Sequence, residues 1–302
     1  MTSVETLEPL KMDYAPAGHR APAGSRLRAL WALYVLTVRQ HLHGKRWMVM
    51  AVLFLLPAGL VVLIRALSSH VPSAAMEFIF AFMFIPQALL PLVALIYGSG
   101  IIQDEQEEQT LTYLLIRPIS KWALYLIKLL ATLTTTVSLT ALFTALTYAA
   151  VYFKAETLVK NVPQRCLEAM ALHSLAVVAY CCLFGLMSLL TKRTLIVGII
   201  YSAIFEGLLA NLPLGIRLVT VIYYTRVIAY RTMPFVEHAP HGTFDLASPV
   251  WQMDIQHDPQ LLEHPQVGTC VLVLLVASVV CAVLAAFLCA RREFHVKTPE
   301  KN

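Results

Sequence analysis

Charged residues are scarce in this sequence of 302 residues. Asp, Glu, Lys and Arg make up 14% of it, whereas hydrophobic residues make up 58%. Soluble globular domains carry about 25% charged and about 45–50% apolar residues. The shortage of charge therefore argues against a soluble protein. The formal net charge of +5 is spread between apolar segments, where it indicates membrane topology rather than a nucleic-acid-binding surface.

Motifs for ATP and metal binding are also missing. No G-x-x-x-x-G-K-S/T sequence occurs, so we expect no ATP site on this chain; Gly98-Ser99-Gly100 is too short to replace it. The outer histidines follow no known metal motif, and the cysteines fit neither a zinc site nor a loop disulfide framework. We therefore expect no catalytic, cofactor or metal site, and we interpret the cysteines as packing residues. These residues are His238, His241, His257 and His264, and Cys166, Cys181, Cys182, Cys270, Cys281 and Cys289. A disulfide between Cys166 and Cys270, near outer helix ends, is conceivable but has no support in the sequence.

What the chain does contain is a series of long, continuous apolar runs. A spanning helix needs about 18–20 apolar residues, and continuous rather than alternating runs favour helices over barrel strands. Six spans are predicted, at 47–67, 78–102, 122–152, 167–190, 195–213 and 267–290. The predicted fold is an all-α integral membrane protein, with a six-helix domain over 47–292.

The segments around these spans have distinct compositions. Residues 1–24 are polar and rich in Pro, Ala and Gly, which predicts a disordered tail without the apolar core of a signal peptide. Residues 25–46 place apolar side chains at helical spacing among basic ones, which predicts an amphipathic elbow helix in the membrane interface. Residues 214–231 are semi-apolar but contain three arginines, so they predict an outer re-entrant or interfacial segment. A Pro-, His- and Asp-rich outer loop follows to residue 266, and residues 293–302 form a second tail.

The distribution of Lys and Arg predicts the orientation. With the N-terminus inside, 16 of the 23 Lys and Arg residues lie on inner segments and 7 on outer ones. The positive-inside rule then places both termini in the cytoplasm of a multi-pass cell-membrane protein.

The segment between the second and third predicted spans, residues 103–121, is the most informative. An acidic run is followed by a short apolar stretch and then by Arg117-Pro118 and Lys121. Pro118 disfavours helix at the preceding residue, so a short amphipathic helix should end there. A charged surface of this kind can dock a partner protein. The residues concerned are Asp104, Glu105, Glu107, Glu108, Thr110, Leu111, Leu114, Leu115, Arg117, Pro118 and Lys121.

This segment resembles the permease subunits of type-2 ABC exporters, the ABC-2 type of ATP-binding cassette transporter. The likeness is carried by Asp104, Glu105, Glu108, Thr110, Leu111, Leu114, Leu115, Pro118, Ser120 and Lys121, while Gln109 stands where many members have Gly. The stretch Glu206-Gly207-Leu208-Leu209-Ala210-Asn211-Leu212-Pro213, followed by Gly215-Ile216-Arg217, also resembles the end of the family's fifth span.

The resemblance implies a mechanism. Two permease subunits, identical or different, would surround a translocation path. The loop over 103–121 would insert a coupling helix into a separate ABC ATPase subunit, which would hold ATP and Mg. ATP binding would then drive alternating access by shifting the population of two packings.

Polar residues inside the predicted spans leave alternatives open. Glu206 fits a substrate-path or helix-coupling group, but it equally fits a structural hydrogen bond near Asn211 and Pro213. An i, i+4 stripe of threonines in the third span fits close helix packing or a polar translocation wall. This stripe consists of Thr132, Thr136, Thr140 and Thr144, extended by Thr147.

Two other functions compete with transport. An intramembrane glutamate protease would need Glu-Glu-x-x-x-Arg, but Thr112 stands where the arginine belongs after Glu107-Glu108. A rhomboid-like serine site would need Gly-x-Ser-Gly, and Tyr97 stands at its first position. A non-transporting membrane scaffold shares the composition and topology, and only the acidic loop argues against it.

Overall fold

The structure is a computed structural model, and it describes residues 23–68, 71–107, 120–153, 161–212, 215–239, 242–251 and 265–292. It contains six helical segments that are long and apolar enough to cross a membrane: Arg46–Leu67, Ser73–Asp104, Lys121–Tyr152, Val162–Leu190, Thr194–Asn211 and Val267–Arg291. The predicted all-α membrane fold with six spans is therefore confirmed. The main differences are that the second and fourth spans begin about five residues earlier than their apolar runs suggest.

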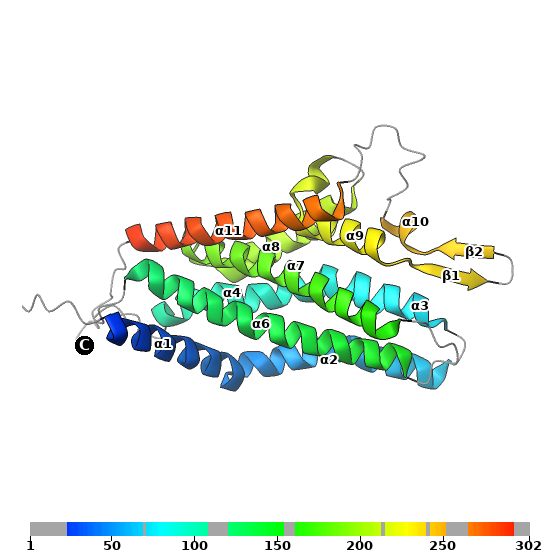
Figure 1. The fold of residues 1–302 in the computed structure, drawn as a ribbon, viewed down its shortest axis with the longest axis horizontal. Helices are drawn as coiled ribbons and strands as arrows, with labels where there is room; N and C mark the ends of the chain where they lie inside the picture. Colours follow the sequence, from blue (N-terminus) through cyan, green and yellow to red (C-terminus); the bar gives the residue numbers. More distant parts are fainter. Residues whose placement is uncertain are drawn as a thin grey trace, which may run out of the picture.

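The elements follow one another in a simple order along an elongated bundle (Figure 1). The helices are α1 (Ala23–His43), α2 (Lys45–Leu67), α3 (Ser73–Met76), α4 (Leu90–Glu107), α6 (Lys121–Tyr152), α7 (Val162–Leu190), α8 (Thr194–Tyr201), α9 (Val221–Thr232), α10 (Ala247–Trp251) and α11 (Val267–Arg291). Two π-helices, η1 (Glu77–Leu89) and η2 (Ser202–Leu208), lie within the second and fifth spans, and two short 3₁₀ helices follow, η3 (Leu209–Asn211) and η4 (Gly215–Val219).

The two ends of the bundle differ. At one end, α1 and α6 begin and α11 finishes; we call it the terminal end. At the other end the strands β1 (Val236–Ala239) and β2 (Gly242–Asp245) form an antiparallel hairpin, in which Val236 pairs with Asp245 and Ala239 with Gly242; we call it the hairpin end. The sequence predicted only an irregular loop over 232–266, so the hairpin and α10 are additional structure.

The central helix of the bundle is α7. It packs against α4, α6 and α11, while α1 and α2 pack on α6. It begins where Asn161 adopts a left-handed backbone conformation with φ of 74°, followed by Pro163 in the first turn. Proline is favoured there because the first-turn N–H groups have no helical partner. The predicted elbow helix over 25–46 overlaps α1, which packs along α6; its position in the membrane interface stays a prediction.

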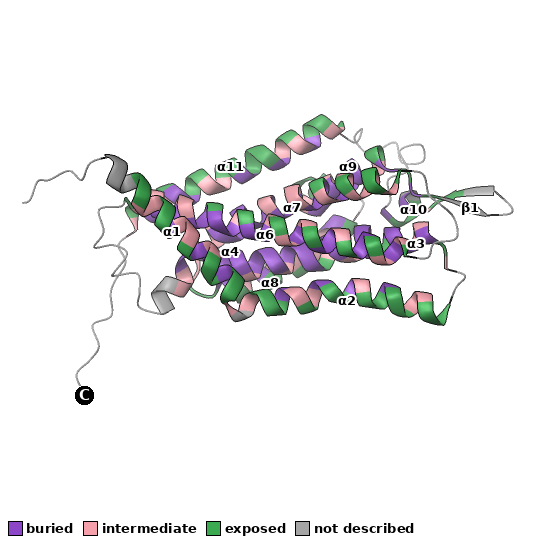
Figure 2. Cartoon of the chain, turned by 60° about the horizontal axis from the view of Figure 1, so that its bottom comes forward, coloured by how far each residue is buried: buried purple, intermediate pink, exposed green. Residues whose placement is uncertain are grey.

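The outer faces of the bundle are apolar and exposed. Figure 2 shows α4 and α7 mostly buried or half-buried, α6 with both buried and exposed turns, and α2 and α11 with long exposed faces. On α11 the exposed side chains include Leu272, Val276, Val279 and Val283. Such a continuous apolar surface is unusual on a soluble monomer and suits contact with lipid.

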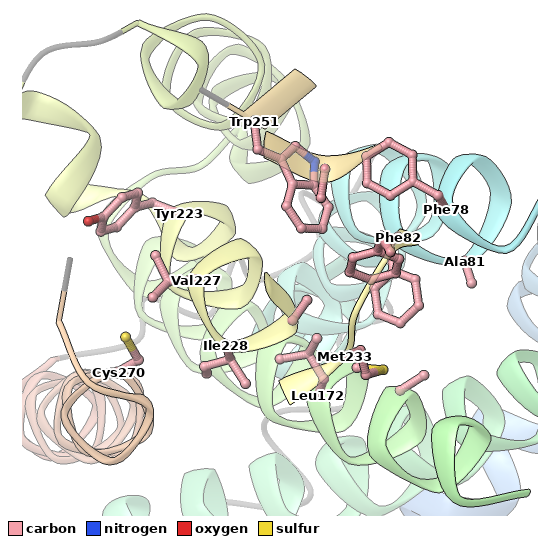
Figure 3. Close-up of a cluster of buried hydrophobic side chains, with 14 of the residues drawn as sticks. Phe78, Ala81, Phe82, Leu172, Tyr223, Val227, Ile228, Met233, Trp251 and Cys270 are labelled. Atoms are coloured by element: carbon pink, nitrogen blue, oxygen red, sulfur yellow. The ribbon is translucent and has the colours of Figure 1, made fainter. Parts of the chain in front are cut away.

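The core is aromatic at the hairpin end. Four aromatic rings pack with centroids 4.8–5.5 Å apart: those of Phe78, Phe82, Phe235 and Trp251. Figure 3 shows Phe78, Phe82 and Trp251 beside side chains of α7 and α9. The Trp251 indole N–H also lies 3.0 Å from the Met83 sulfur. This cluster attaches the segment that follows α9 to η1, so the hairpin has a fixed base.

Candidate functional site

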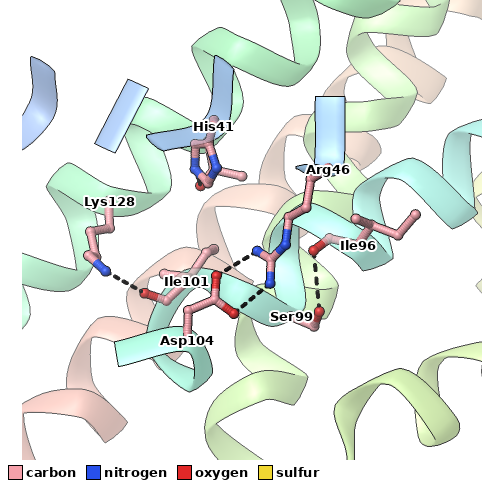
Figure 4. A network of polar contacts seen from close by, with 8 residues as sticks. His41, Arg46, Ile96, Ser99, Ile101, Asp104 and Lys128 are labelled. Carbon is pink, nitrogen blue, oxygen red and sulfur yellow. Dashed lines mark hydrogen bonds and ion pairs between the residues drawn. The ribbon is translucent and has the colours of Figure 1, made fainter. Parts of the chain in front are cut away.

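The predicted coupling segment starts at an ion pair that joins α4 to α2. The guanidinium of Arg46 contacts both carboxylate oxygens of Asp104, at 2.6 Å each (Figure 4). Two parallel charge-assisted bonds of this kind fix orientation as well as distance. Because both side chains are about one-third exposed, water screens the pair and its contribution to stability is modest.

Gly100, one turn before Asp104, leaves room for the ion pair. A Cβ atom on Gly100 would lie 2.1 Å from Arg46 Nη1 and 2.5 Å from Asp104 Oδ2. A larger residue would therefore displace the ion pair. Because Gly100 has no side chain, the Arg46 guanidinium can lie against α4 at this position.

Two buried basic side chains lie near this ion pair. The ammonium of Lys128 donates to the carbonyl of Ile101 at 3.3 Å. The imidazole of His41, on α1, contacts the Thr132 hydroxyl at 3.2 Å and the edge of the Tyr97 ring. Burial lowers the pKa of His41 to about 4, and the positive charges of Arg46 and Lys128 act in the same direction. A neutral His41 therefore joins α1 to α6 at neutral pH.

Both ends of the predicted coupling segment are attached to other helices. The Gln103 amide donates to the Thr191 carbonyl at 2.9 Å and contacts the Thr194 hydroxyl at 2.8 Å, where α7 gives way to α8. At the other end, the Lys121 ammonium donates to the Arg292 carbonyl at 3.0 Å, just after α11. The Arg292 guanidinium in turn donates to the Leu189 carbonyl. A displacement of the segment would thus act on α2, α8 and α11.

The middle of the predicted coupling segment lies outside the described residues. Glu105 and Glu107 belong to the last turns of α4, but only their backbone is described. The remaining candidates of this segment, apart from Asp104 and Lys121, are not described: Glu108, Thr110, Leu111, Leu114, Leu115, Arg117 and Pro118. The docking surface itself stays a prediction.

Glu206 lies on η2 and is fully buried. Its two carboxylate oxygens accept the backbone N–H groups of Val221 at 3.1 Å and Ile222 at 3.0 Å, the first two residues of α9. The Tyr201 hydroxyl lies 3.4 Å away. A negative charge at a helix N-terminus satisfies free donors and complements the helix dipole, so Glu206 holds α9 against the fifth span.

Asn211 has a related position. Its side-chain oxygen accepts a hydrogen bond from the Arg226 guanidinium at 2.9 Å, and its amide group donates to the Gly207 carbonyl. Asn211 and Glu206 thus both connect the fifth span to α9, but they do so through different partners.

The threonine stripe of α6 is fully buried. Thr136 donates to the Thr132 carbonyl at 2.9 Å and also contacts the Cys181 thiol on α7. Thr144 contacts the imidazole of His173, also on α7, at 3.0 Å. Within the described part of the chain, the Thr140 hydroxyl has no hydrogen-bond partner. The structure places the stripe between α6 and its neighbours α1 and α7.

Sequence reasoning overlooked one buried ionic group, at the hairpin end. The carboxylate of Glu77, 1% exposed, accepts hydrogen bonds from the hydroxyls of Tyr148 at 2.7 Å and Tyr152 at 2.6 Å, and from Arg165 at 3.0 Å. Arg165 also donates to the Pro234 carbonyl at 3.1 Å. One carboxylate therefore joins η1, α6, α7 and the base of the hairpin. The signal available in the sequence was Glu77 itself, a single acidic residue directly before an apolar span.

Metal-binding side chains do not gather in the described ranges: no group of three or more His, Cys, Asp or Glu residues converges there. His238 lies on β1, whereas His241, His257 and His264 lie outside those ranges. Cys166 and Cys270 are separate free thiols.

Comparison with known protein families finds a match to a transporter family. Residues 42–207, more than half of the chain, match the family described as ABC-2 family transporter protein. The matched region runs from the end of α1 through η2, and it includes the ion pair of Arg46 and Asp104. No curated protein matches the sequence closely.

Proposed function

Because the chain belongs to the ABC-2 family of transporter membrane proteins, we propose that it is the permease subunit of an ATP-binding cassette exporter. The terminal end of the bundle faces the cytoplasm, as the distribution of Lys and Arg indicates. A separate ATPase subunit, which holds ATP and Mg, docks on the segment over 103–121. A second permease subunit completes the path, and the two work by alternating access.

The observation that best supports this proposal is the anchoring of both ends of the 103–121 segment. Asp104 pairs with Arg46 at the start of α2, and Lys121 bonds to Arg292 at the end of α11. When both ends of the segment are bonded to other helices, a displacement of the segment also moves those helices. A loop without such bonds could move alone. Such ties would allow docking at the segment to bias rigid-body movement between two packings.

Docking can be tested by co-purification. The full chain is expressed with a candidate ATP-binding cassette ATPase, and we expect the two to co-purify in detergent. Deleting residues 104–118 should abolish co-purification while the chain still elutes as a monodisperse species. Persistence of the complex without these residues would refute docking at this segment. Failure of the unaltered chain to capture any such ATPase would instead support a scaffold.

Coupling can be tested separately with a matched pair of variants. Asp104→Ala removes the ion pair but leaves residues 105–118 in place, so we expect the ATPase to stay bound. The nucleotide-dependent change in protease sensitivity of the reconstituted complex should decrease at least several-fold. Asp245→Ala, which removes an aspartate from the hairpin end, is the control and should leave that change intact. Equal responses in the two variants would contradict transmission through Arg46 and Asp104.

A further inference from the structure

The segment between the fifth span and the hairpin concentrates positive charge where little water reaches. Residues 215–232 contain Arg217, Arg226 and Arg231 and no Asp or Glu. Arg217 and Arg226 are each only 5% exposed. Buried charges of one sign are costly unless an opposite charge approaches them, and in membrane proteins they commonly mark ligand or ion sites.

The guanidinium of Arg226 is held by neutral acceptors. It donates to Asn211 Oδ1 at 2.9 Å and, at longer range, to the Ala210 carbonyl at 3.5 Å and Gln87 Oε1 at 3.4 Å. Arg217 lies over the ring of Tyr223, with 5.0 Å between the guanidinium carbon and the ring centroid. Over the described residues, neither arginine forms an ion pair with a carboxylate.

The nearby acid does not neutralise the pair. Glu206 supplies at most one negative charge against two positive ones, and both of its oxygens accept the backbone N–H groups at the start of α9. Burial lowers the pKa of Arg226 to about 10; Glu206 opposes this shift, whereas the positive charge of Arg217 adds to it. The positive charge of the two arginines thus exceeds the negative charge near them, and an additional anion would stabilise Arg226.

Apolar side chains lie directly beside the arginines in the sequence. Ile216, Leu218 and Val219 in η4 are 46%, 37% and 67% exposed, while Arg217 between them is turned inward. This places exposed aliphatic groups next to a buried cation. A molecule with an anionic group and a hydrocarbon part could pair with the buried cation and cover the exposed aliphatic side chains.

We propose that Arg217 and Arg226 form an anion-binding site at the hairpin end of the bundle, which takes the phosphate of an amphiphilic molecule. Guanidinium groups match phosphate oxygens in paired hydrogen bonds. The site does not depend on the proposed coupling to an ATPase, because it lies at the opposite end of the bundle.

Binding is tested on the full purified chain in detergent with three probes. These are dihexanoyl-phosphatidylglycerol, dihexanoyl-phosphatidylcholine and inorganic phosphate. The readouts are the thermal unfolding midpoint and the adducts retained in native mass spectrometry. We expect phosphatidylglycerol to raise the midpoint by several degrees and to be retained, and phosphatidylcholine to do neither. A shift with inorganic phosphate alone would identify a free anion as sufficient, whereas a shift with phosphatidylglycerol only would identify a lipid headgroup.

Variants locate the site. Arg217→Gln should weaken phosphatidylglycerol binding at least tenfold, and it breaks no side-chain hydrogen bond among the described residues. Arg226→Gln also loses its bonds to Asn211 and Gln87, so it is the secondary variant. Arg28→Gln, an exposed position on α1, is the control and should bind as the unaltered chain does. Equal retention of the two lipids, or full binding by Arg217→Gln, would overturn the proposal.

Discussion

The strongest single perturbation available in the structure is removal of Arg165, the partner of the buried Glu77. In Arg165→Met the carboxylate keeps its bonds to Tyr148 and Tyr152 but loses its positive partner. The side chain of Glu77 is 2% exposed and that of Arg165 is 15% exposed, so water cannot replace the lost charge at Glu77. Breaking a buried pair from one side costs about 3–5 kcal/mol.

The reverse substitution should cost less. In Glu77→Gln the remaining charge is on Arg165, which is more accessible and keeps the Pro234 carbonyl as an acceptor. We expect a loss of about 1–3 kcal/mol. The double variant should be more stable than Arg165→Met alone, because it contains no buried unpaired carboxylate. This rescue distinguishes a charge effect from a loss of packing.

The assay is thermal unfolding in detergent, followed by reaction of a thiol-specific dye with cysteines that are buried in the fold, such as Cys181 and Cys289. One kcal/mol corresponds to about 2–4 °C in domains of 150–250 residues. We therefore expect Arg165→Met to lower the midpoint by at least about 6 °C. Glu168→Gln, on the same helix, is the control and should change the stability by less than about 0.5 kcal/mol. If the double variant lost as much as the two single losses combined, the reasoning would be refuted.

Three further outcomes are expected. Gly198→Val should destabilise the fold by about 1–3 kcal/mol, since a Cβ there would lie 2.2 Å from a methyl of Leu95; an unchanged thermal midpoint would contradict close packing of α8 on α4. Glu206→Gln should lower the stability by about 0.3–2 kcal/mol through loss of charge at the start of α9, and proteolysis there should accelerate. The stabilising contribution of a neutral His41 should be complete above pH 6.5 and decline as the pH falls towards about 4, because the folded pKa is the lower one. His41→Gln should therefore show a smaller loss of midpoint over that range, and an identical pH profile would argue against a buried neutral imidazole.

The six spans were predictable because each depends on a local property. A run of about 20 apolar residues needs no knowledge of its neighbours, and the observed spans follow those runs closely. The early starts of the second and fourth spans are the exceptions, and the second span shows the reason most clearly. Its first turns contain Glu77, which looks like a polar boundary in the sequence but is buried by partners 71–88 residues away.

The polar contacts were less predictable for the same reason. That Asp104 would meet Arg46 depends on how α4 crosses α2, and that Glu206 would meet the start of α9 depends on how the chain turns between them. The π-helices η1 and η2 were also unforeseen, because apolar periodicity does not distinguish an i+5 hydrogen-bond pattern from an α-helix inside a continuous apolar run. The sequence identified Asp104 and Glu206 as candidates by residue type and position, but their partners depend on the fold.

The threonines of α6 have a consequence for where a solute can travel. The hydroxyls of Thr135, Thr136 and Thr147 donate hydrogen bonds to carbonyls four residues earlier on the same helix. These threonines therefore contact neighbouring helices mainly through their methyl groups. The whole stripe is fully buried, and the hydroxyls of Thr136 and Thr144 already contact Cys181 and His173 on α7, so the seam between α6 and α7 leaves few hydroxyls to replace the hydration shell of a passing molecule. We expect the permeation route to run along the periphery of this chain, where lipid or a second subunit supplies the other wall.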